Sequence, residues 1–253
     1  MPLDVHQFPC LSDNYGFLVR DRATGRTACI DTPDATAILA ELDKLGWKLD
    51  FILNTHWHPD HAGGNAEIQK ATGATSVGPA EVERLVPLDR KVGGGDEVML
   101  GETRFQVIDT GGHTLGHITY YDAADRIAFV GDTLFALGCG RLFEGTAEQM
   151  WTSLQRLAVL PDDTTVYCAH EYTASNARFA LSVDDDPALK ARAEAVFAAR
   201  ERGEPTVPTT VAAEKATNPF LRAPRLAMRV GAAGKPDFEA FGAVRAAKDG
   251  FKG

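Results

Sequence analysis

Three histidines and one aspartate lie within six residues of the chain, at His56, His58, Asp60 and His61. In an extended segment alternate side chains share a face, so His56 and His58 can bind one metal ion together. Pro59 then redirects the backbone, which lets Asp60 and His61 point toward a neighbouring position. Clustered imidazole and carboxylate groups are costly unless they are paired. The segment therefore predicts metal binding.

Three further candidate ligands come from distant parts of the chain, because four ligands so close together rarely complete two sites. Each directly follows a predicted strand: His113 follows 103–108, Asp132 follows 127–130, and His170 follows 165–168. Loops beyond the carboxyl ends of strands are where α/β folds place their chemistry. Imidazole and carboxylate ligands without thiolate suit Zn²⁺, Fe or Mn²⁺. Two such ions about 3.5–4 Å apart can share a hydroxide, so the ligand set predicts a hydrolytic site.

His6 and His117 are the two histidines outside this set. His6 belongs to a predicted edge strand and is interpreted as structural. His117 ends the segment His113-Thr114-Leu115-Gly116-His117. It is either a core residue, which is the favoured interpretation, or a group that contacts a ligand from behind. Asp31 follows the predicted strand 27–30 and is expected to orient a ligand histidine in that way.

Short strands and helices must position these residues. Strands are expected at 16–20, 27–30, 51–53, 103–108, 117–121, 127–130 and 165–168. A first helix is expected from the cap Asp34 to Gly46, and a helix-like pattern covers 65–70. A capping box opens another helix at Thr146, which stops before Pro161. This alternation predicts a mixed α/β domain.

The sequence pattern changes at about residue 173, beyond which no strand is predicted. Helices are expected from Asp186-Pro187 to 201–203, over a short segment before Asn218-Pro219, and from about Phe238 onward. The sequence therefore predicts two domains. Residues 1–172 form the mixed α/β domain and residues 173–253 form a helical module.

Composition limits the classes of partner. The formal net charge of −9 over 253 residues disfavours nucleic acid or an anionic membrane as the main partner. No apolar run approaches the ~20 residues of a membrane span, and no signal peptide is visible. The four cysteines show no paired metal spacing and are interpreted as buried, reduced thiols. We expect a cytoplasmic protein, and we favour a monomer.

The metal motif His56-x-His58-x-Asp60-His61, with the three later segments, resembles the metallo-β-lactamase superfamily. The resemblance implies a four-layer αββα sandwich with a binuclear metal site. It also implies two ligand sets that share Asp132: His56, His58 and His113 for the first ion, and Asp60, His61 and His170 for the second. β-Lactamases of this superfamily commonly have Cys at the position of Asp132, which argues against that activity.

More closely, the chain resembles the glyoxalase II family of hydroxyacylglutathione hydrolases from about residue 3 to 252. The stretches that carry this resemblance are 132–145, 170–173, 207–210, Asn218-Pro219-Phe220 and 245–252. The resemblance implies hydrolysis of S-D-lactoylglutathione to D-lactate and glutathione by a metal-bridging hydroxide, in the detoxification of methylglyoxal. Zinc is the metal expected first, with iron or manganese as alternatives.

Candidate substrate contacts follow from both the residues and the resemblance. Arg245 and Lys248 lie three apart on a predicted helix, so they share a face and can meet one carboxylate of glutathione together. Arg141 and Tyr172 supply further donors, and the resemblance points to the same positions. Some relatives carry Lys and Tyr where this chain has Arg141 and Phe143, so the contacts there are open.

The loop before His113 departs from the pattern of the superfamily. It has Gly111 where the superfamily often has Pro. The closest rival function is a glutathione persulfide dioxygenase with a single iron, which shares much of the ligand set. The Asn218-Pro219-Phe220 segment and the Arg245–Lys248 pair favour the hydrolase. A nuclease or a non-enzymatic metal-binding module fits the acidic chain and the carboxylate-rich ligands less well.

Overall fold

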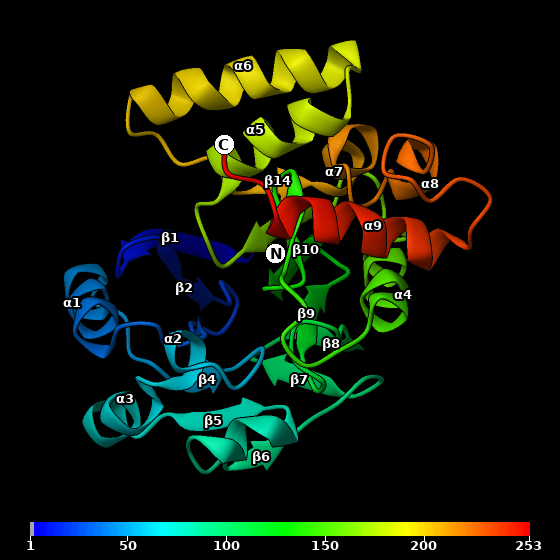
Figure 1. Ribbon diagram of the computed structural model, residues 1–253. Helices are drawn as coiled ribbons and strands as arrows, with labels where there is room; N and C mark the ends of the chain where they lie inside the picture. The colour runs from blue at the N-terminus through cyan, green and yellow to red at the C-terminus, as the bar shows by residue number, and fades with distance from the viewer. Residues whose placement is uncertain (1–2) are drawn as a thin grey trace. The chain divides into compact units, whose positions relative to one another are not determined.

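The computed structural model of the chain describes residues 3–253, which form two compact units (Figure 1). Unit 1 comprises the chain up to Asp109 together with Thr114–Gly131. Unit 2 comprises Thr110–His113 and Asp132–Gly253. The predicted domain boundary between residues 172 and 173 is a different division of the chain, and it stays a prediction.

Unit 1 is built on a mixed six-stranded sheet in sequence order: β1 (Asp4–Cys10), β2 (Asn14–Arg20), β3 (Thr27–Ile30), β4 (Phe51–Leu53), β5 (Thr75–Gly78) and β6 (Arg90–Lys91). The first three strands pair antiparallel, and the pairs from β3 to β6 are parallel. The helical segments between them are α1 (Ala35–Leu45), α2 (Pro59–Ala62), α3 (Asn65–Thr72) and the 3₁₀ turn η1 (Ala80–Arg84). The parallel strands thus end where helices begin, which places α2 directly beyond β4.

An antiparallel set of four strands also belongs to unit 1: β7 (Glu97–Leu100), β8 (Thr103–Asp109), β9 (Ile118–Asp122) and β10 (Ile127–Gly131). It packs on the first sheet, because the ring of Phe17 on β2 lies 5.7 Å from that of Phe129 on β10. The buried Tyr120 hydroxyl also donates to the carbonyl of Asn54 at 2.9 Å.

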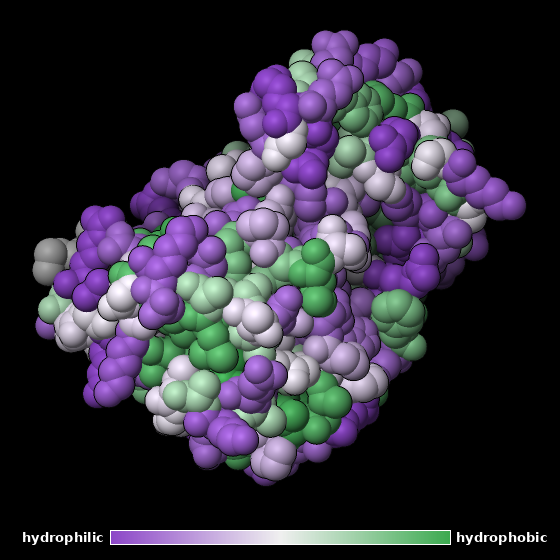
Figure 2. Space-filling model, turned by 90° about the vertical axis from the view of Figure 1, so that its left-hand side faces the viewer, coloured by the Kyte–Doolittle hydropathy of each residue, from purple (hydrophilic) through white to green (hydrophobic). Residues whose placement is uncertain are grey.

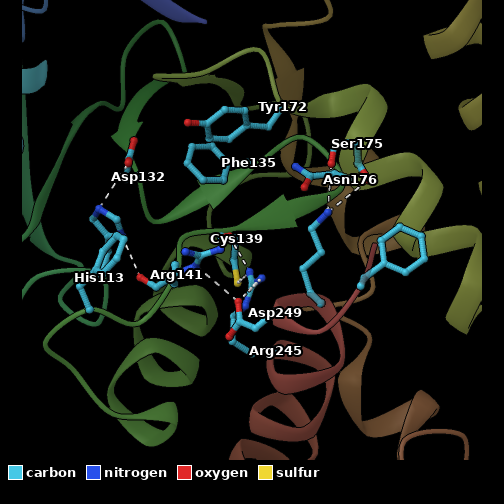
Figure 3. Close-up of a pocket in the computed structure, with 13 residues that line it drawn as sticks. His113, Asp132, Phe135, Cys139, Arg141, Tyr172, Ser175, Asn176, Arg245 and Asp249 are labelled. Carbon is cyan, nitrogen blue, oxygen red and sulfur yellow. Dashed lines mark hydrogen bonds and ion pairs between the residues drawn. The ribbon is translucent and has the colours of Figure 1, made fainter. Parts of the chain in front are cut away.

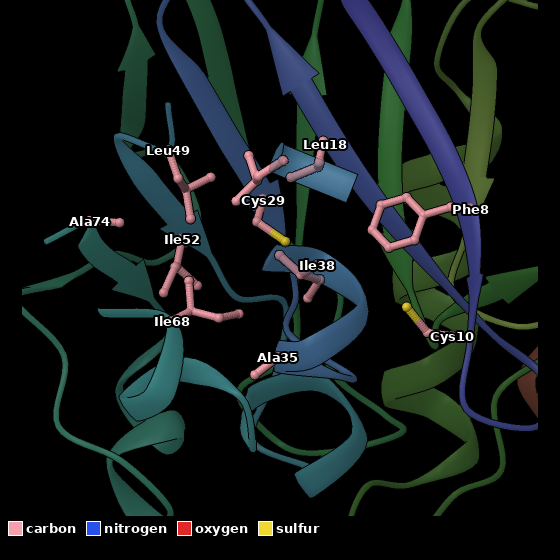
Figure 4. Packing of buried hydrophobic residues seen from close by; sticks show 11 residues of the cluster. Phe8, Cys10, Leu18, Cys29, Ala35, Ile38, Leu49, Ile52, Ile68 and Ala74 are labelled. Atoms are coloured by element: carbon pink, nitrogen blue, oxygen red, sulfur yellow. The ribbon is translucent and has the colours of Figure 1, made fainter. Parts of the chain in front are cut away.

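Buried apolar side chains fill the space between the first sheet and its helices (Figure 4). Ile38 of α1 and Ile68 of α3 face Leu18 and Ile52 of the sheet, and none of the four is exposed. Burying apolar area from water in this way stabilises each helix on the sheet. The helices are therefore fixed platforms for the loops that follow the strands.

Unit 2 is mostly helical: α4 (Ala147–Ala158), α5 (Thr173–Val183), α6 (Pro187–Glu201), α7 (Val211–Thr217), α8 (Ala223–Leu226) and α9 (Asp237–Asp249). Two short antiparallel pairs complete it: β11 (Leu134–Phe135) with β12 (Gly138–Cys139), and β13 (Thr165–Cys168) with β14 (Thr209–Thr210). Leu189, Ala193 and Val196 of α6 pack on Ala177 and Ala180 of α5. Helix α9 packs on α4 and α8.

The local predictions are largely confirmed. The strands expected at 27–30, 51–53 and 165–168 have those bounds, and the other predicted strands differ by one or two residues. Asp34 accepts a hydrogen bond from Ala37 N, and Gly46 ends α1 with a left-handed φ of 64°. Thr146 caps α4 as expected by accepting from Gln149 N. Helix α5 is absent from the prediction, because it starts after Tyr172, which provides no side-chain cap.

The cysteines also match expectation. All four cysteines are free and buried, as the thiol interpretation predicts. Figure 2 shows hydrophilic residues over most of one face, with smaller hydrophobic areas among them. Exposed single apolar residues are ordinary on protein surfaces. Within residues 3–253, no helix has the length and apolar character that a membrane crossing requires.

Candidate metal centre and adjoining pocket

Unit 1 contributes four candidate ligands just beyond β4. His56 and His58 lie in the loop, and Pro59 starts α2, which carries Asp60 and His61. His56 Nε2 lies 3.1 Å from His58 Nδ1, and His61 Nε2 lies 3.6 Å from Asp60 Oδ2. Two ligands about 2.0–2.1 Å from one tetrahedral ion are about 3.3 Å apart. The spacing of each pair therefore fits two ligands of one ion.

Asp31 orients His61 from behind, as the sequence predicts. Its Oδ2 lies 2.8 Å from His61 Nδ1, which leaves Nε2 as the nitrogen directed at a metal. The same carboxylate accepts from the backbone N–H and the hydroxyl of Thr55 at 2.7 and 2.8 Å. A left-handed φ of 57° at Asp31 brings the carboxylate to these donors.

A second support for this loop comes from two buried asparagines that sequence reasoning misses. Asn54 Nδ2 donates to the His61 carbonyl at 2.9 Å, and Asn65 Nδ2 donates to Asn54 Oδ1 at 2.7 Å. Thr32 N also donates to the His61 carbonyl, at 2.8 Å. The only signal in the sequence is that Asn54 directly precedes the histidine cluster.

The two remaining histidines have different surroundings. His117 is buried, and its ring stacks on that of His56 at 4.8 Å. His117 is thus a core residue, as the favoured interpretation has it, and its ring also contacts the candidate ligand His56. His6 lies on the edge strand β1, and its Nε2 is 2.7 Å from Glu41 Oε2 on α1. This contact agrees with a structural role for His6.

Replacing Asp31 with asparagine is expected to weaken metal binding about 10- to 100-fold, because outer partners of ligands typically contribute that much. The amide cannot accept from all three donors that meet the carboxylate. Competition with a chelator measures the affinity. Asp50→Asn is a matched control, since Asp50 also accepts from a backbone N–H, at Thr27, but contacts no candidate ligand. Equal affinities in Asp31→Asn and wild type would contradict the orienting role.

Unit 2 contributes the other three candidate ligands, all of them buried. The two oxygens of Asp132 face different histidines: Oδ2 lies 3.3 Å from His113 Nε2, and Oδ1 lies 3.3 Å from His170 Nε2. His113 Nδ1 lies 2.8 Å from the Arg141 carbonyl, so Nε2 is the nitrogen left for a metal. A carboxylate placed between two imidazoles has the geometry of a bridging ligand.

The close approach of the Gly140 backbone to Asp132 and His113 supports this placement of the two candidate ligands. A Cβ at Gly140 would lie 1.9 Å from the Asp132 carbonyl oxygen and 3.1 Å from His113 Nδ1, so only glycine fits there. The Gly111 departure is also accommodated, because Ser153 of α4 donates to the Gly111 carbonyl at 2.6 Å. This hydrogen bond anchors the loop before His113.

The side-chain chemistry of the candidate ligands suits a metal ion. The residues that could hold a metal ion are His56, His58, Asp60, His61, His113, Asp132 and His170. All offer imidazole nitrogen or carboxylate oxygen, and none is a thiolate, which suits zinc, iron or manganese. Their identity does not distinguish among these metals.

A cavity of about 450 Å³ in unit 2 contains both His113 and Asp132 in its wall (Figure 3). The predicted substrate contacts line it as well: Arg141, Phe143, Tyr172, Arg245 and Lys248. Residues predicted from separate segments are therefore brought together in one pocket. Tyr172 stacks on His170 with ring centroids 4.6 Å apart, and Phe143 meets His113 edge-on at 5.2 Å.

Charged groups of the pocket are held in fixed contacts. Arg245 is buried, with Nη2 2.9 Å from Asp249 Oδ1, and Arg141 Nε lies 3.6 Å from the same oxygen. Lys248 Nζ donates to the carbonyl and the hydroxyl of Ser175, both at 3.2 Å. Burial, and then the nearby Arg245 and Arg178, lower the pKa of Lys248 to about 8. Asp249 is a pocket residue that sequence reasoning misses.

Cys139 also lines the pocket but is a poor nucleophile. Burial raises the pKa of its thiol to about 11, although Arg245 acts in the opposite direction. The thiol is therefore neutral at physiological pH, and a covalent thioester intermediate on it is disfavoured.

Sequence comparison assigns the chain to a family. Residues 17–170 match the metallo-β-lactamase superfamily, and residues 171–251 match the hydroxyacylglutathione hydrolase C-terminus. A hydroxyacylglutathione hydrolase of Erythrobacter litoralis is 55% identical over 250 residues, covering 98% of this chain and 100% of that protein. One of Maricaulis maris is 56% identical over 251 residues, covering 98% of each chain. The chain belongs to the hydroxyacylglutathione hydrolase family. Hydrolysis of a glutathione thioester is accordingly its function, and the residues of a binuclear metallohydrolase site are present.

Solved structures agree with the predicted fold. ETHE1 from Myxococcus xanthus has a TM-score of 0.69 and 29% identity, covering 96% of this chain and 90% of that one. TTHA1623 in a di-iron-bound form has a TM-score of 0.63 and 25% identity, covering 86% of this chain and all of that one. These matches confirm the metallo-β-lactamase fold, to which the hydrolase adds a helical C-terminal module.

Proposed function

We propose that this hydrolase acts chiefly on S-D-lactoylglutathione and releases D-lactate and glutathione, in methylglyoxal detoxification. The observation that carries the proposal is the pocket itself, in which basic and aromatic residues share one wall with His113 and Asp132. Full-length identity of 55–56% to hydroxyacylglutathione hydrolases supports it. Residues 1–172 would supply catalysis, and residues 173–253 would supply the glutathione-binding helices.

The proposed metal sites follow the family pattern. His56, His58 and His113 would hold one ion, Asp60, His61 and His170 would hold the other, and Asp132 would contribute to both. When bound, the two ions supply a hydroxide at neutral pH and neutralise the developing oxyanion. We favour zinc, with iron or manganese as alternatives. Iron is an alternative because TTHA1623, which has a similar fold, has a di-iron-bound form. Asp31 keeps the His61 tautomer fixed throughout.

The chain's own residues bind and orient the thioester. Arg245 and Lys248 on α9 bind one carboxylate of glutathione, and Arg141 supplies a further donor. Tyr172, stacked on His170, presents its hydroxyl near the peptide. Phe143 has no hydroxyl group, and its ring packs on His113 and near the Arg141 guanidinium, so it would contact the substrate by apolar packing and not by a hydrogen bond. Orientation of this kind lowers the entropic part of the barrier.

We further propose a cytoplasmic monomer. Every proposed ligand and pocket residue comes from one chain, so a second subunit is not needed to complete the site. The four buried free thiols suit a reducing compartment, in which glutathione is also reduced.

A steady-state assay with S-D-lactoylglutathione, with metal content determined on the same sample, tests the proposal. Rapid hydrolysis with close to two ions per chain supports both the reaction and the site. Two ions without hydrolysis would redirect the search to other thioesters. A single iron, no hydrolysis, and oxygen uptake with glutathione persulfide would favour the dioxygenase alternative.

The pH dependence of substrate binding provides a separate prediction. A carboxylate binds the protonated form of Lys248, whose pKa is about 8, so kcat/KM is expected to fall as the pH rises through about 8. The charged groups around Lys248 are Arg245 and Asp249 on α9 and Arg178 on α5. Lys248→Arg keeps its charge, and it should extend the plateau toward higher pH. Lys215→Arg, at an exposed ion pair, is the control. If kcat/KM falls over the same alkaline pH range in wild type and in Lys248→Arg, a group other than Lys248 causes the decline.

A further inference from the structure

The hairpin β11–β12 connects a metal ligand to a substrate contact. β11 begins at Leu134, two residues after Asp132, and β12 ends at Cys139, two residues before Arg141. The two strands form a sheet of their own, with a left-handed φ of 57° at Leu137 in the turn. Two strands of two residues are too short to be stable alone. The backbone groups on their outer edges therefore need other partners.

Those partners are side chains from the C-terminal helices and the segment after α7. The hydrogen bonds run from Asn218 Nδ2 to the carbonyls of Phe135 (3.1 Å) and Gly138 (2.9 Å), from Leu137 N to Glu214 Oε2 (2.9 Å), from Asn176 Nδ2 to the carbonyl of Ala136 (3.1 Å), and from Arg245 Nη1 to the carbonyl of Cys139 (3.0 Å). All four of these side chains belong to buried residues. The helical part of unit 2 thus forms hydrogen bonds to both strands of the hairpin and to its turn.

The orientation of the Asn218 amide is determined by its neighbours. Its Oδ1 accepts from Phe220 N at 2.9 Å, so its NH₂ group faces the hairpin and Glu214 Oε2, at 2.8 Å. Aspartate has the same shape but supplies no donor. Phe220 reaches the hairpin by a second route, because its ring lies 5.0 Å from the guanidinium of Arg245. This gives the Asn218-Pro219-Phe220 segment a physical role.

Glu214 is the anchor of the network. Its carboxylate is fully buried, forms an ion pair with Arg192 and accepts from Thr209 Oγ1 at 2.6 Å. A buried charge is stable only when paired and hydrogen-bonded, so this carboxylate has little freedom to move. Buried hydrogen bonds of this kind restrict the motion of the groups that they join.

We propose that Asn218 and Glu214 are positioning residues of the active site, which fix the β11–β12 hairpin and so place Asp132 at one end and Arg141 at the other. The C-terminal helices then determine the metal end of the site as well as the pocket. The part of this inference that concerns Arg141 rests on the proposed function. The part that concerns Asp132 rests only on the contacts of the hairpin.

Asn218→Ala and Asn218→Asp test the inference. Both should fold, and amide hydrogen exchange in residues 134–141 should become at least about tenfold faster. Binding of S-methylglutathione, which cannot be hydrolysed, should weaken about tenfold because Arg141 is no longer held. Metal should also be lost to a chelator more readily than from wild type. Leu42→Ala, a substitution in the core between α1 and the first sheet, is the control for a general loss of stability.

The outcomes separate positioning from stability. Leu42→Ala is expected to lower the Tm and to leave hairpin exchange, S-methylglutathione affinity and metal retention unchanged at 25 °C. Wild-type values of all three in Asn218→Ala would overturn the proposal. If Asn218→Ala does not fold, Asn218→Ser, which keeps one short donor, is measured in its place. Relative to wild type it must show faster hairpin exchange, weaker binding of S-methylglutathione and easier loss of metal. A wild type that fails to hydrolyse the thioester contradicts the proposed function alone, since exchange and metal retention still test the hairpin.

Discussion

Asp132→Ala is expected to lower kcat by at least about 10³-fold and to reduce the metal content from two ions toward one. The reason is the position of its carboxylate, each oxygen of which faces a different histidine at 3.3 Å. Removing it takes one ligand from each proposed ion at the same time. Metal analysis and single-turnover kinetics on the same preparation measure both effects.

Two variants make this result specific. Asp132→Asn keeps the shape and one good acceptor, so it should retain one ion more firmly than Asp132→Ala while still losing most of the rate. Asp162→Ala removes an exposed partner of Lys215 and should change neither quantity. Normal metal content and turnover in Asp132→Ala would refute the proposed site, provided that circular dichroism shows a folded protein.

The first half of the ligand set was readable from the sequence because it is local. His56, His58, Asp60 and His61 are close in the chain, so their spacing alone indicates shared chemistry. His113, Asp132 and His170 are far apart, and the sequence predicts them because each directly follows a predicted strand. Once these strands are located in the sequence, the residues that directly follow them are located as well.

The supporting contacts could not be predicted in this way, because they join residues without any periodic signal. Asn54 donates to the His61 carbonyl and accepts from Asn65, and Asp249 contacts both Arg141 and Arg245. Each is an ordinary polar residue whose role depends on a partner that only the folded chain brings near. Helix α5 is missing from the prediction for a related reason, since its packing on α6 stabilises it without a capping residue.

The sequence predicts the pocket residues only in part. Arg245 and Lys248 were placed on one helix face by their spacing, and both line the cavity of unit 2. The spacing does not reveal that Arg245 is buried while Lys248 is partly accessible. This difference in burial predicts different effects when each residue is replaced.

Arg245→Ala is expected to raise KM for the glutathione thioester about 100-fold. Charge-assisted hydrogen bonds to a carboxylate contribute about 1.5–3 kcal/mol, and about 1.4 kcal/mol corresponds to a factor of ten. The guanidinium also donates to the Cys139 carbonyl at 3.0 Å, so kcat should fall by a smaller factor as the hairpin loosens. Steady-state kinetics with direct binding of S-methylglutathione separates the two effects.

Arg245→Lys distinguishes charge from geometry. Lysine keeps the positive charge but cannot bond Asp249, the Cys139 carbonyl and a substrate carboxylate in one planar arrangement. KM should therefore rise about tenfold, between the values for wild type and Arg245→Ala. Arg229→Ala, which removes an exposed ion pair with Asp185, should leave KM unchanged. A wild-type KM in Arg245→Ala would place the substrate carboxylate elsewhere, and Lys248 with Arg141 would then be the pair to replace.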